Sequence, residues 1–350
     1  MKHPSSIKVL KSTMLIAGVL LVGCKDKNLF EKVEEIEIEN NESLEVETQS
    51  FQISEVIVTA DSRTFPVKSI ITFEVFAETE ALFDGPQEIA AHNSLLARVN
   101  ISALPELKLE SSDPEILYIP ERESMGIARK AGTVTVYAHF RGVQSAPLRL
   151  EILPELTSCG EIDDTNKTNS KGACLKVVKG LSGEAKDKLF TSSPSTKFLG
   201  ALNYISSDTS DNVGKTYANT ILGGGRYAPK TTFFGLFRQD GQDATLDGTD
   251  GQYDRYCQHL GLLEYLNRND WRRVTGQELV DLFHDHGNLF QNYGFFNKAV
   301  YWTSSQVMPG QKVTKPFEFY RMGLYKGGVA SRARTLRFAA SCVSVSDVIN

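Results

Sequence analysis

Short runs of apolar and β-branched residues alternate with turn residues between positions 50 and 155. The runs lie at 56–58, 70–75, 107–109, 134–138 and 148–153. Strands that alternate apolar and polar positions bury one face, and short strands separated by frequent turns are typical of a sandwich of two sheets. The pattern predicts an all-β domain over residues 50–155, which we call the sandwich.

Helical spacing of apolar residues begins near position 253. Tyr256, Leu260, Leu263 and Leu266 fall near helical spacing in a predicted helix, and Cys257 lies on the same side. The run 275–278 reads Thr-Gly-Gln-Glu, a capping box that predicts a second helix over 276–283.

Short strands are predicted after these helices at 300–303, 317–322 and 335–343. Residues 156–350 therefore form a second domain that mixes helices and strands, which we call the head.

The N-terminus carries three lysines and no acid before an apolar stretch at 14–22. A basic region followed by a short apolar one is typical of a secretory signal, and the stretch is shorter than the ~20 residues that cross a membrane. It ends Leu21-Val22-Gly23-Cys24, which resembles the lipobox of bacterial lipoproteins. The resemblance implies removal of residues 1–23, lipidation of Cys24 and attachment to a membrane. Lys25 after the cysteine favours the outer membrane; an ordinary signal peptide with a chance cysteine is the alternative.

Charge differs between the segments that follow. Residues 25–49 hold nine acids and three bases, and like charges this dense extend a chain, so 24–49 is predicted to be an acidic tether. The head holds nineteen acids and twenty-three bases. That basic excess is too small and scattered to indicate nucleic-acid binding.

Four cysteines remain once Cys24 is lipidated, and an even number in an exported chain favours two disulfides. Cys159 and Cys174 flank a polar loop, so a local bridge is the simplest interpretation for them, although four cysteines allow three pairings. A zinc site is the weaker alternative, because C-x-x-C spacing is missing. No cofactor is expected.

The sandwich resembles the group 2 bacterial Ig-like domains. The resemblance rests on the run Leu-Glu-Ser-Ser-Asp-Pro at 109–114 and the run Ala-Gly-Thr-Val-Thr-Val at 131–136. The triplet Phe-Asp-Gly at 83–85 lies where that family often has a strand-joining turn. The resemblance implies a spacer or adhesin module.

The head resembles the C-type-lectin-like domains of invasin/intimin-type adhesins and a wider set of bacterial lectin-like domains. Its motifs follow the same order: Tyr256-Cys257, Asp270-Trp271-Arg272, Tyr301-Trp302-Thr303-Ser304-Ser305 and Ser341-Cys342-Val343-Ser344. The resemblance implies a Cys257–Cys342 bridge from the first helix to the last strand. It also implies that Cys159–Cys174 closes an extra hairpin. The sequence departs from the wider set at Arg273-Val274, where Leu-Pro is common.

Two patterns raise the possibility of a bound metal. Acids recur from Asp240 to Asp254, and calcium prefers carboxylate and carbonyl oxygens, but a solvated loop is the favoured interpretation. The sugar-binding tripeptides that coordinate calcium in lectins are missing. His284-Asp285-His286 is interpreted as a polar segment after the second helix rather than a metal site.

A contact surface is predicted from aromatic and basic residues late in the head. Tyrosine is enriched in binding hot spots, and two arginines on one strand face would meet an acidic partner. Core packing of the aromatics and a solvated basic face are the alternatives. The predicted surface consists of Tyr293, Phe295, Phe296, Phe317, Phe319, Tyr320, Arg332 and Arg334.

These features predict a membrane-anchored recognition or adhesion lipoprotein, in which the tether and sandwich present the head to a protein or glycan partner. The alternative function is a structural lipoprotein that scaffolds an envelope complex. An enzyme is not expected, because the related thiol chemistry needs free cysteines and Cys257 and Cys342 are expected to be oxidised.

Overall fold

The computed structural model describes residues 50–82, 97–224, 230–307 and 318–345. The predicted signal peptide, the lipidated Cys24 and the acidic tether lie outside these residues, as do the 83–85 turn and Phe317. Within the described residues, no helix is both long and apolar enough to cross a membrane.

The sandwich consists of two five-stranded sheets, as predicted. One sheet has the order β1-β3-β7-β6, with β4 on β3; the other has the order β2-β10-β8-β5, with β9 on β8. The first contains β1 (Ser50–Ala60), β3 (Ile70–Leu82), β4 (Ala97–Asn100), β6 (Leu117–Tyr118) and β7 (Met125–Ala128). The second contains β2 (Thr64–Pro66), β5 (Lys108–Ser111), β8 (Gly132–Phe140), β9 (Val143–Gln144) and β10 (Leu148–Leu153).

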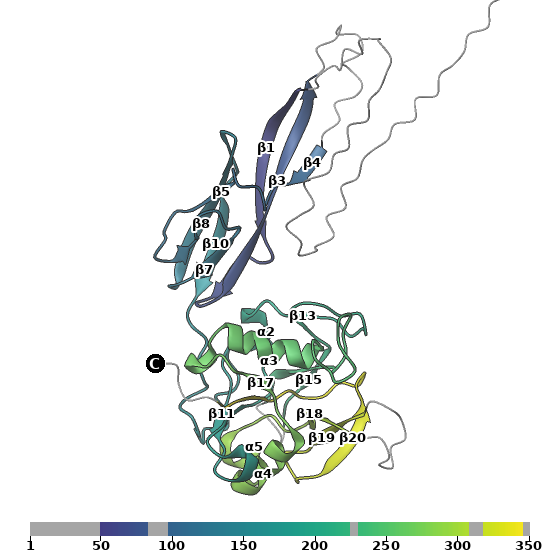
Figure 1. The fold of residues 1–350 in the computed structure, drawn as a ribbon. Coiled ribbons are helices and arrows are strands. Elements are labelled where there is room, and N and C mark those ends of the chain that lie inside the picture. Colours follow the sequence, from purple (N-terminus) through teal and green to yellow (C-terminus); the bar gives the residue numbers. More distant parts are fainter. Residues whose placement is uncertain (1–49, 83–96, 225–229, 308–317, 346–350) are drawn as a thin grey trace, which may run out of the picture. The chain divides into compact units, whose positions relative to one another are not determined.

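Alternating side chains of both sheets fill the sandwich core. Val134, Val136 and Ala138 of β8 are buried, and they share one apolar cluster with Val56 of β1 and Phe73 of β3. Successive side chains of a strand point to opposite faces, so the apolar positions of each sheet reach the same interior. Figure 1 shows β1 and β3 as the long antiparallel pair of this domain.

The head has its own cores and small sheets. A four-stranded sheet, in the order β11-β12-β21-β17, contains β11 (Val177–Lys179), β12 (Leu189–Thr191), β17 (Arg272–Arg273) and β21 (Cys342–Ser344). A three-stranded sheet contains β18 (Tyr301–Gln306), β19 (Glu318–Met322) and β20 (Val329–Ala333) in that order. Two-stranded pairs are β13 (Ile205–Ser206) with β14 (Thr216–Tyr217), and β15 (Asn219–Leu222) with β16 (Phe233–Leu236).

Among the described residues of the head, four α-helices pack around these strands. They are α2 (Thr196–Ala201), α3 (Gln252–Leu262), α4 (Gly276–His286) and α5 (Leu289–Tyr293), with 3₁₀ turns η1 (Gly183–Ala185) and η2 (Tyr265–Asn267). Helices α2 and α3 lie on one side of the central strands and α4 and α5 on the other (Figure 1). Their buried side chains form two apolar clusters, and Trp302 of the first and Tyr301 of the second are consecutive residues of β18.

The predicted helices are present, but the last predicted strand is not continuous. Thr275 and Glu278 form a complete capping box at the start of α4, which extends past position 283 to include the 284–286 segment. The prediction of one strand over 335–343 is wrong, because the chain there is mostly turn and isolated bridges, and β21 begins only at Cys342.

Candidate functional site

Two disulfides fix the framework of the head. Cys159 is bonded to Cys174 with a sequence separation of 15, and Cys257 to Cys342 with a separation of 85. The second joins α3 to β21, the two elements that the resemblance implied. Both of its cysteines are fully buried, so this bridge belongs to the core.

The recurring tryptophan motifs hold the fold together. The indole Nε1 of Trp271 donates to the carbonyl of Tyr265 at 2.8 Å, and that of Trp302 donates to the carbonyl of Phe237 at 2.7 Å. A buried indole N–H needs such an acceptor, because an unsatisfied donor costs about 1–3 kcal/mol. These motifs are structural, since both tryptophans are at most 3% exposed.

Glu278 at the start of α4 is the most densely bonded carboxylate of the head. It receives hydrogen bonds from Arg272 (2.6 and 3.0 Å), from Lys188 (2.7 Å) and from the backbone N–H of Thr275 (2.8 Å). Burial raises the pKa of Glu278, but the bonds from Arg272 and Lys188 outweigh burial and lower it to about 2. The Trp-Arg motif therefore supplies the counter-ion that lets a helix start inside the domain.

Acid should destabilise the head through this carboxylate. The folded pKa of Glu278 is about 2 against an ordinary 4.5. Its stabilisation is therefore fully present above about pH 4.5 and is lost as the pH falls towards 2. One pKa unit corresponds to ~1.4 kcal/mol, so up to about 3 kcal/mol depends on this ionisation.

We expect Glu278→Gln to flatten the dependence of the unfolding free energy on pH between 5 and 3. Urea unfolding followed by tryptophan fluorescence measures this, because both tryptophans lie in the head. An unchanged slope in the variant would contradict the assignment.

The acidic run at 240–254 is closed by arginines. Arg238 pairs with Asp240 through Nε at 2.6 Å, and Arg273 pairs with Asp254 through Nε at 2.8 Å. Arg273 also donates to the side chain of Gln239 and to the carbonyl of Asp247, both at 3.0 Å. The Arg273 guanidinium thus occupies oxygen atoms that could otherwise coordinate a metal ion. The described residues contain no cluster of three metal-binding side chains. The prediction of a solvated loop is wrong for Asp240, which is 3% exposed.

The ion pair between Arg273 and Asp254 gives a physical reason for the departure from the wider lectin-like set at position 273. Arg273 is buried in β17, and only a long cationic side chain there reaches Asp254 on α3 and the loop before it. In the sequence, this ion pair was visible only as a mismatch with the wider lectin-like set. The mismatch did not indicate what the arginine would bind.

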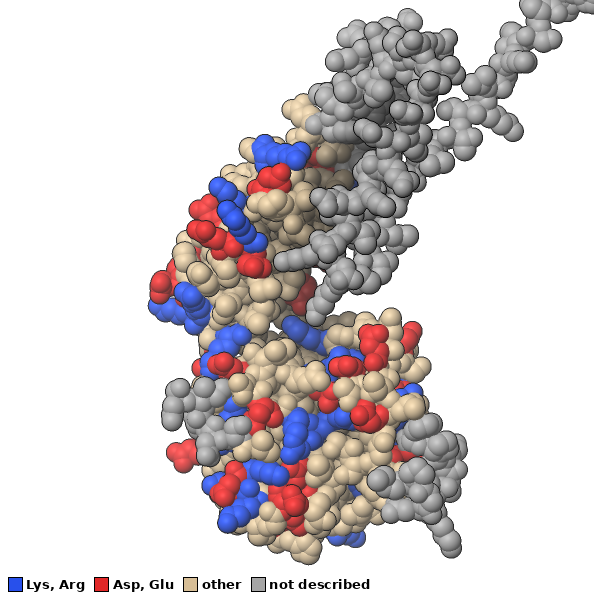
Figure 2. Space-filling model, viewed as in Figure 1, with Lys and Arg blue, Asp and Glu red and all other residues tan. Residues whose placement is uncertain are grey.

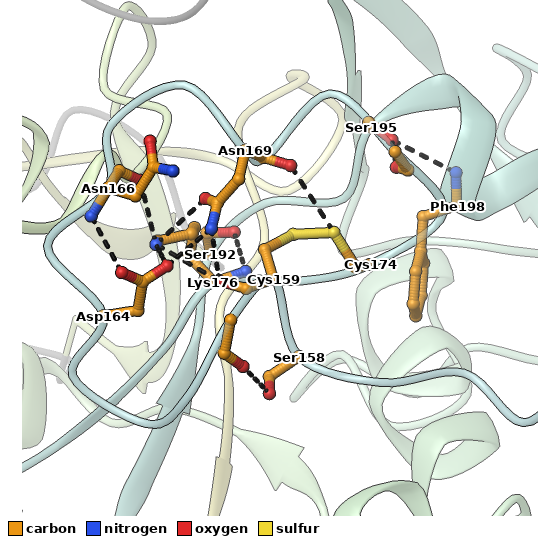
Figure 3. Close-up of a disulfide and its surroundings, with 12 residues drawn as sticks. Ser158, Cys159, Asp164, Asn166, Asn169, Cys174, Lys176, Ser192, Ser195 and Phe198 are labelled. Atoms are coloured by element: carbon orange, nitrogen blue, oxygen red, sulfur yellow. Dashed lines mark hydrogen bonds and ion pairs between the residues drawn. A yellow bond between two sulfur atoms is a disulfide. The ribbon is translucent and has the colours of Figure 1, made fainter.

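A second internal cation lies beside the Cys159–Cys174 bridge (Figure 3). The Lys176 side chain is only 1% exposed, and its ammonium group donates to Asp164 at 2.8 Å and to the Asn169 side-chain oxygen at 3.1 Å. It also donates to the carbonyls of Asn166 and Cys159, at 3.0 and 3.3 Å. The hydrogen bond from Lys176, with those from the Asn166 backbone and Asn169, lowers the pKa of Asp164 to about 2.

The His284-Asp285-His286 segment is structural. Asp285 accepts from the backbone N–H groups of Leu181 and Ser182 at 2.7 and 3.0 Å. His286 bonds the Tyr293 hydroxyl at 2.8 Å and the Lys179 carbonyl at 2.7 Å, so both ring nitrogens are used. The segment closes the end of α4 onto the chain before η1 rather than following the helix as a loop.

The aromatic part of the predicted contact surface is wrong at three positions. Phe295, Phe296 and Phe319 are fully buried. Phe296 stacks on Phe234 with ring centroids 4.6 Å apart, and Phe319 meets Trp302 edge-on. Aromatic rings contribute most when packed, and the runs predicted as a surface instead fill the two cores. Tyr293 and Tyr320 are half-buried, and Phe317 lies outside the described residues.

The basic part of that surface is accessible. Arg332 on β20 is exposed, and Arg334 just beyond it is half-buried. Arg321 on β19 lies over the ring of Phe338, with 4.9 Å from its guanidinium carbon to the ring centre. We call Arg321, Arg332 and Arg334 the arginine edge.

The arginine edge lacks carboxylate partners among the described residues. Arg332 donates to the carbonyl of Ser331, and Arg334 to the carbonyl of Thr245. Nε of Arg321 is buried and has no hydrogen-bond partner in the described structure. Burial lowers the pKa of Arg321, and the charge of Arg332 lowers it further, so two guanidinium groups repel each other here.

Most of the other described arginines of the head behave differently, although Arg255 also has no ion pair among the described residues and donates instead to the carbonyls of Gly214 and Asp250 and to the side chain of Asn212. Four of them each pair with a carboxylate: Arg238, Arg272, Arg273 and Arg337. Figure 2 shows acidic and basic side chains interspersed over the face in view, without a broad field of one sign. The arginine edge is therefore a local concentration of positive charge. Arg321 was missed in the sequence because it stands inside a run that reads as an aromatic strand.

Comparisons with known proteins give weak neighbours only. No protein-family model matches the chain, and no curated protein matches it. The adhesin InvE of Yersinia pseudotuberculosis is similar over 83% of this chain and 70% of its own, at 8% identity and a TM-score of 0.29. A C-terminal 282-residue fragment of intimin, in complex with the intimin-binding domain of its translocated receptor, is similar over 83% of this chain and 99% of its own. Its identity is 11% and its TM-score 0.20. Scores this low do not establish a shared fold.

Proposed function

We propose that this chain is a lipid-anchored recognition protein of the bacterial cell envelope whose head binds a partner through the arginine edge. Cys24 anchors the chain, and the acidic tether and the sandwich carry the head away from the lipid surface. The observation that carries the proposal is the arginine edge itself: among the described residues its three guanidinium groups have no carboxylate partner, whereas four other arginines of the head do.

The arginine edge is energetically unfavourable while no ligand is bound to it. Arg321 loses hydration by burial, gains no carboxylate and is repelled by Arg332. A partner's carboxylate or phosphate would satisfy the free donors with charge-assisted hydrogen bonds, which are about twice as strong as neutral ones. Arginine is also among the residues enriched in binding hot spots. The edge therefore gains more from an acidic partner than from water alone.

Reversing the charge of two arginines of the edge should weaken recognition. We expect the double variant Arg332→Glu/Arg334→Glu to weaken partner binding at least about tenfold, because two attractive contacts become repulsive. The measurement is a binding screen of the full chain against glycans and cell-surface proteins, repeated with the variant on each ligand found.

The matched control is Arg122→Glu/Arg129→Glu, which makes the same charge change at two exposed arginines of the sandwich. Equal losses in both variants would reduce the effect to net charge and sink the proposed site. Protease treatment of intact cells separates the alternative function. A head protected on whole cells, with a stoichiometric envelope partner, would favour scaffolding over adhesion.

A further inference from the structure

Strand β20 is the outer strand of the sheet β18-β19-β20. Within the described parts of the chain, no other strand pairs with its free side. An outer strand presents N–H and C=O groups that can pair with a further strand, and natural proteins block such edges unless they are used. The open side of β20 is therefore a place where a partner's backbone can bind.

Arg321 of β19 and Arg332 of β20 lie on one face of this sheet. Arg332 is opposite Phe319 in the ladder, and Ala330, two residues earlier, is opposite Arg321. Residues two apart on a strand share a face, so Ala330 and Arg332 point to the same side. Arg334 lies one residue beyond the end of β20, in a turn, where its guanidinium donates to the carbonyl of Thr245.

Ala330 leaves the way to Arg321 open. Its side chain is a single methyl group between Arg321 and the free side of β20. Neighbouring strands lie about 4.8 Å apart, so a residue on an added strand would be about 10 Å from the backbone of β19. A glutamate reaching inwards and an arginine reaching outwards span that distance together.

The other face of β20 has a different character. There Ser331 donates to the carboxylate of Glu318 at 2.5 Å. Glu318 is 6% exposed, so an acid on that face would meet a carboxyl group that is already bonded to Ser331. An added strand is thus favoured when acidic residues alternate with uncharged ones.

We propose that β20 accepts an extended acidic peptide of a partner protein as an additional strand, with acidic side chains at alternate positions facing Arg321, Arg332 and Arg334. This inference rests on the proposed function and names the class of partner for the same site. The peptide is favoured over an anionic glycan because it alone supplies the regular N–H and C=O groups that match the open side of β20. Opposite charges across a strand pair then fix its register.

The test uses the full chain and a fluorescently labelled heptapeptide, Thr-Glu-Val-Glu-Val-Glu-Thr, measured by fluorescence anisotropy. A second peptide has the same composition with its three glutamates consecutive. Two more carry N-methyl groups, one on its glutamates and the other on its valines. Because N–H groups alternate along a strand, only one of the two N-methylated peptides should lose binding.

We expect the alternating peptide to bind at least about tenfold more tightly than the consecutive one, and Arg332→Glu/Arg334→Glu to remove that preference. Arg122→Glu/Arg129→Glu should keep it. Equal binding of all four peptides would show attraction by charge alone and overturn the added strand. Tighter binding of polygalacturonate than of the peptide would move the partner to the glycan class and overturn it as well.

The outcome also separates this inference from the proposed function. If Arg332→Glu/Arg334→Glu abolished binding of a partner found in the screen while none of the heptapeptides bound the unmodified chain, the recognition edge would stand and the peptide partner would be wrong.

Discussion

Replacing Cys257 and Cys342 together by alanine will lower the free energy of unfolding of the head by about 4.6 kcal/mol. The bridge closes a loop of 85 residues, and cross-linking that length removes about this much conformational freedom from the unfolded chain on the chain-entropy model. It joins α3 to β21, so its loss also loosens the sheet that contains the Trp-Arg motif. Urea unfolding followed by the fluorescence of Trp271 and Trp302 measures the effect on the head alone.

The matched control removes the other bridge. Cys159→Ala/Cys174→Ala opens a separation of only 15 residues, for which the same model gives about 3 kcal/mol. The long-range bridge should therefore contribute more than the local one. A smaller loss from the long-range pair than from the local pair would contradict loop closure as the source of stability.

Lys176→Met is expected to cost the head about 3 kcal/mol. Methionine has nearly the same length but no charge, so Asp164 loses its cation and the carbonyls of Cys159 and Asn166 lose a donor. Breaking a buried ion pair from one side costs about 3–5 kcal/mol. The lower end applies because the Asp164 side chain is 21% exposed, so water replaces part of the contact. Chemical denaturation read by tryptophan fluorescence gives the value.

Lys197→Met provides the control, since Lys197 is an exposed lysine on α2. It should change the unfolding free energy by less than about 0.5 kcal/mol. If Lys176→Met were as mild as Lys197→Met, the four oxygens around the ammonium would be held by the disulfide alone, and the internal cation would be unnecessary.

Sequence patterns predicted helices and strands correctly where neighbouring residues alone determine them. The capping box of α4 is set by two residues three apart, and the strands of the sandwich by alternation of neighbouring residues. The same local rules failed at 335–343, where apolar residues are buried by isolated bridges to distant segments rather than by a strand. Burial there depends on Phe237 and Tyr301, which are far away in the sequence.

The candidate site was predictable only in part. Arg332 and Arg334 were found because their spacing is visible in the sequence. Arg321 was not, because only the fold shows that no carboxylate of the described residues pairs with it. The opposite error was made for Phe295, Phe296 and Phe319, which were predicted on the surface but are buried. An aromatic run looks the same in the sequence whether it faces solvent or the core.

The sequence by itself determined the alternating strands of the sandwich and the mixture of helices and short strands in the head that follows it. Those features follow from composition and from spacing between near neighbours. The tertiary structure decided which charges are neutralised: Arg273 pairs with Asp254, Lys176 pairs with Asp164 beside the disulfide, and the arginine edge has no carboxylate partner in the part of the chain that the structure describes. Pairing of charges depends on distances between residues far apart in the chain, and only the folded chain sets those distances.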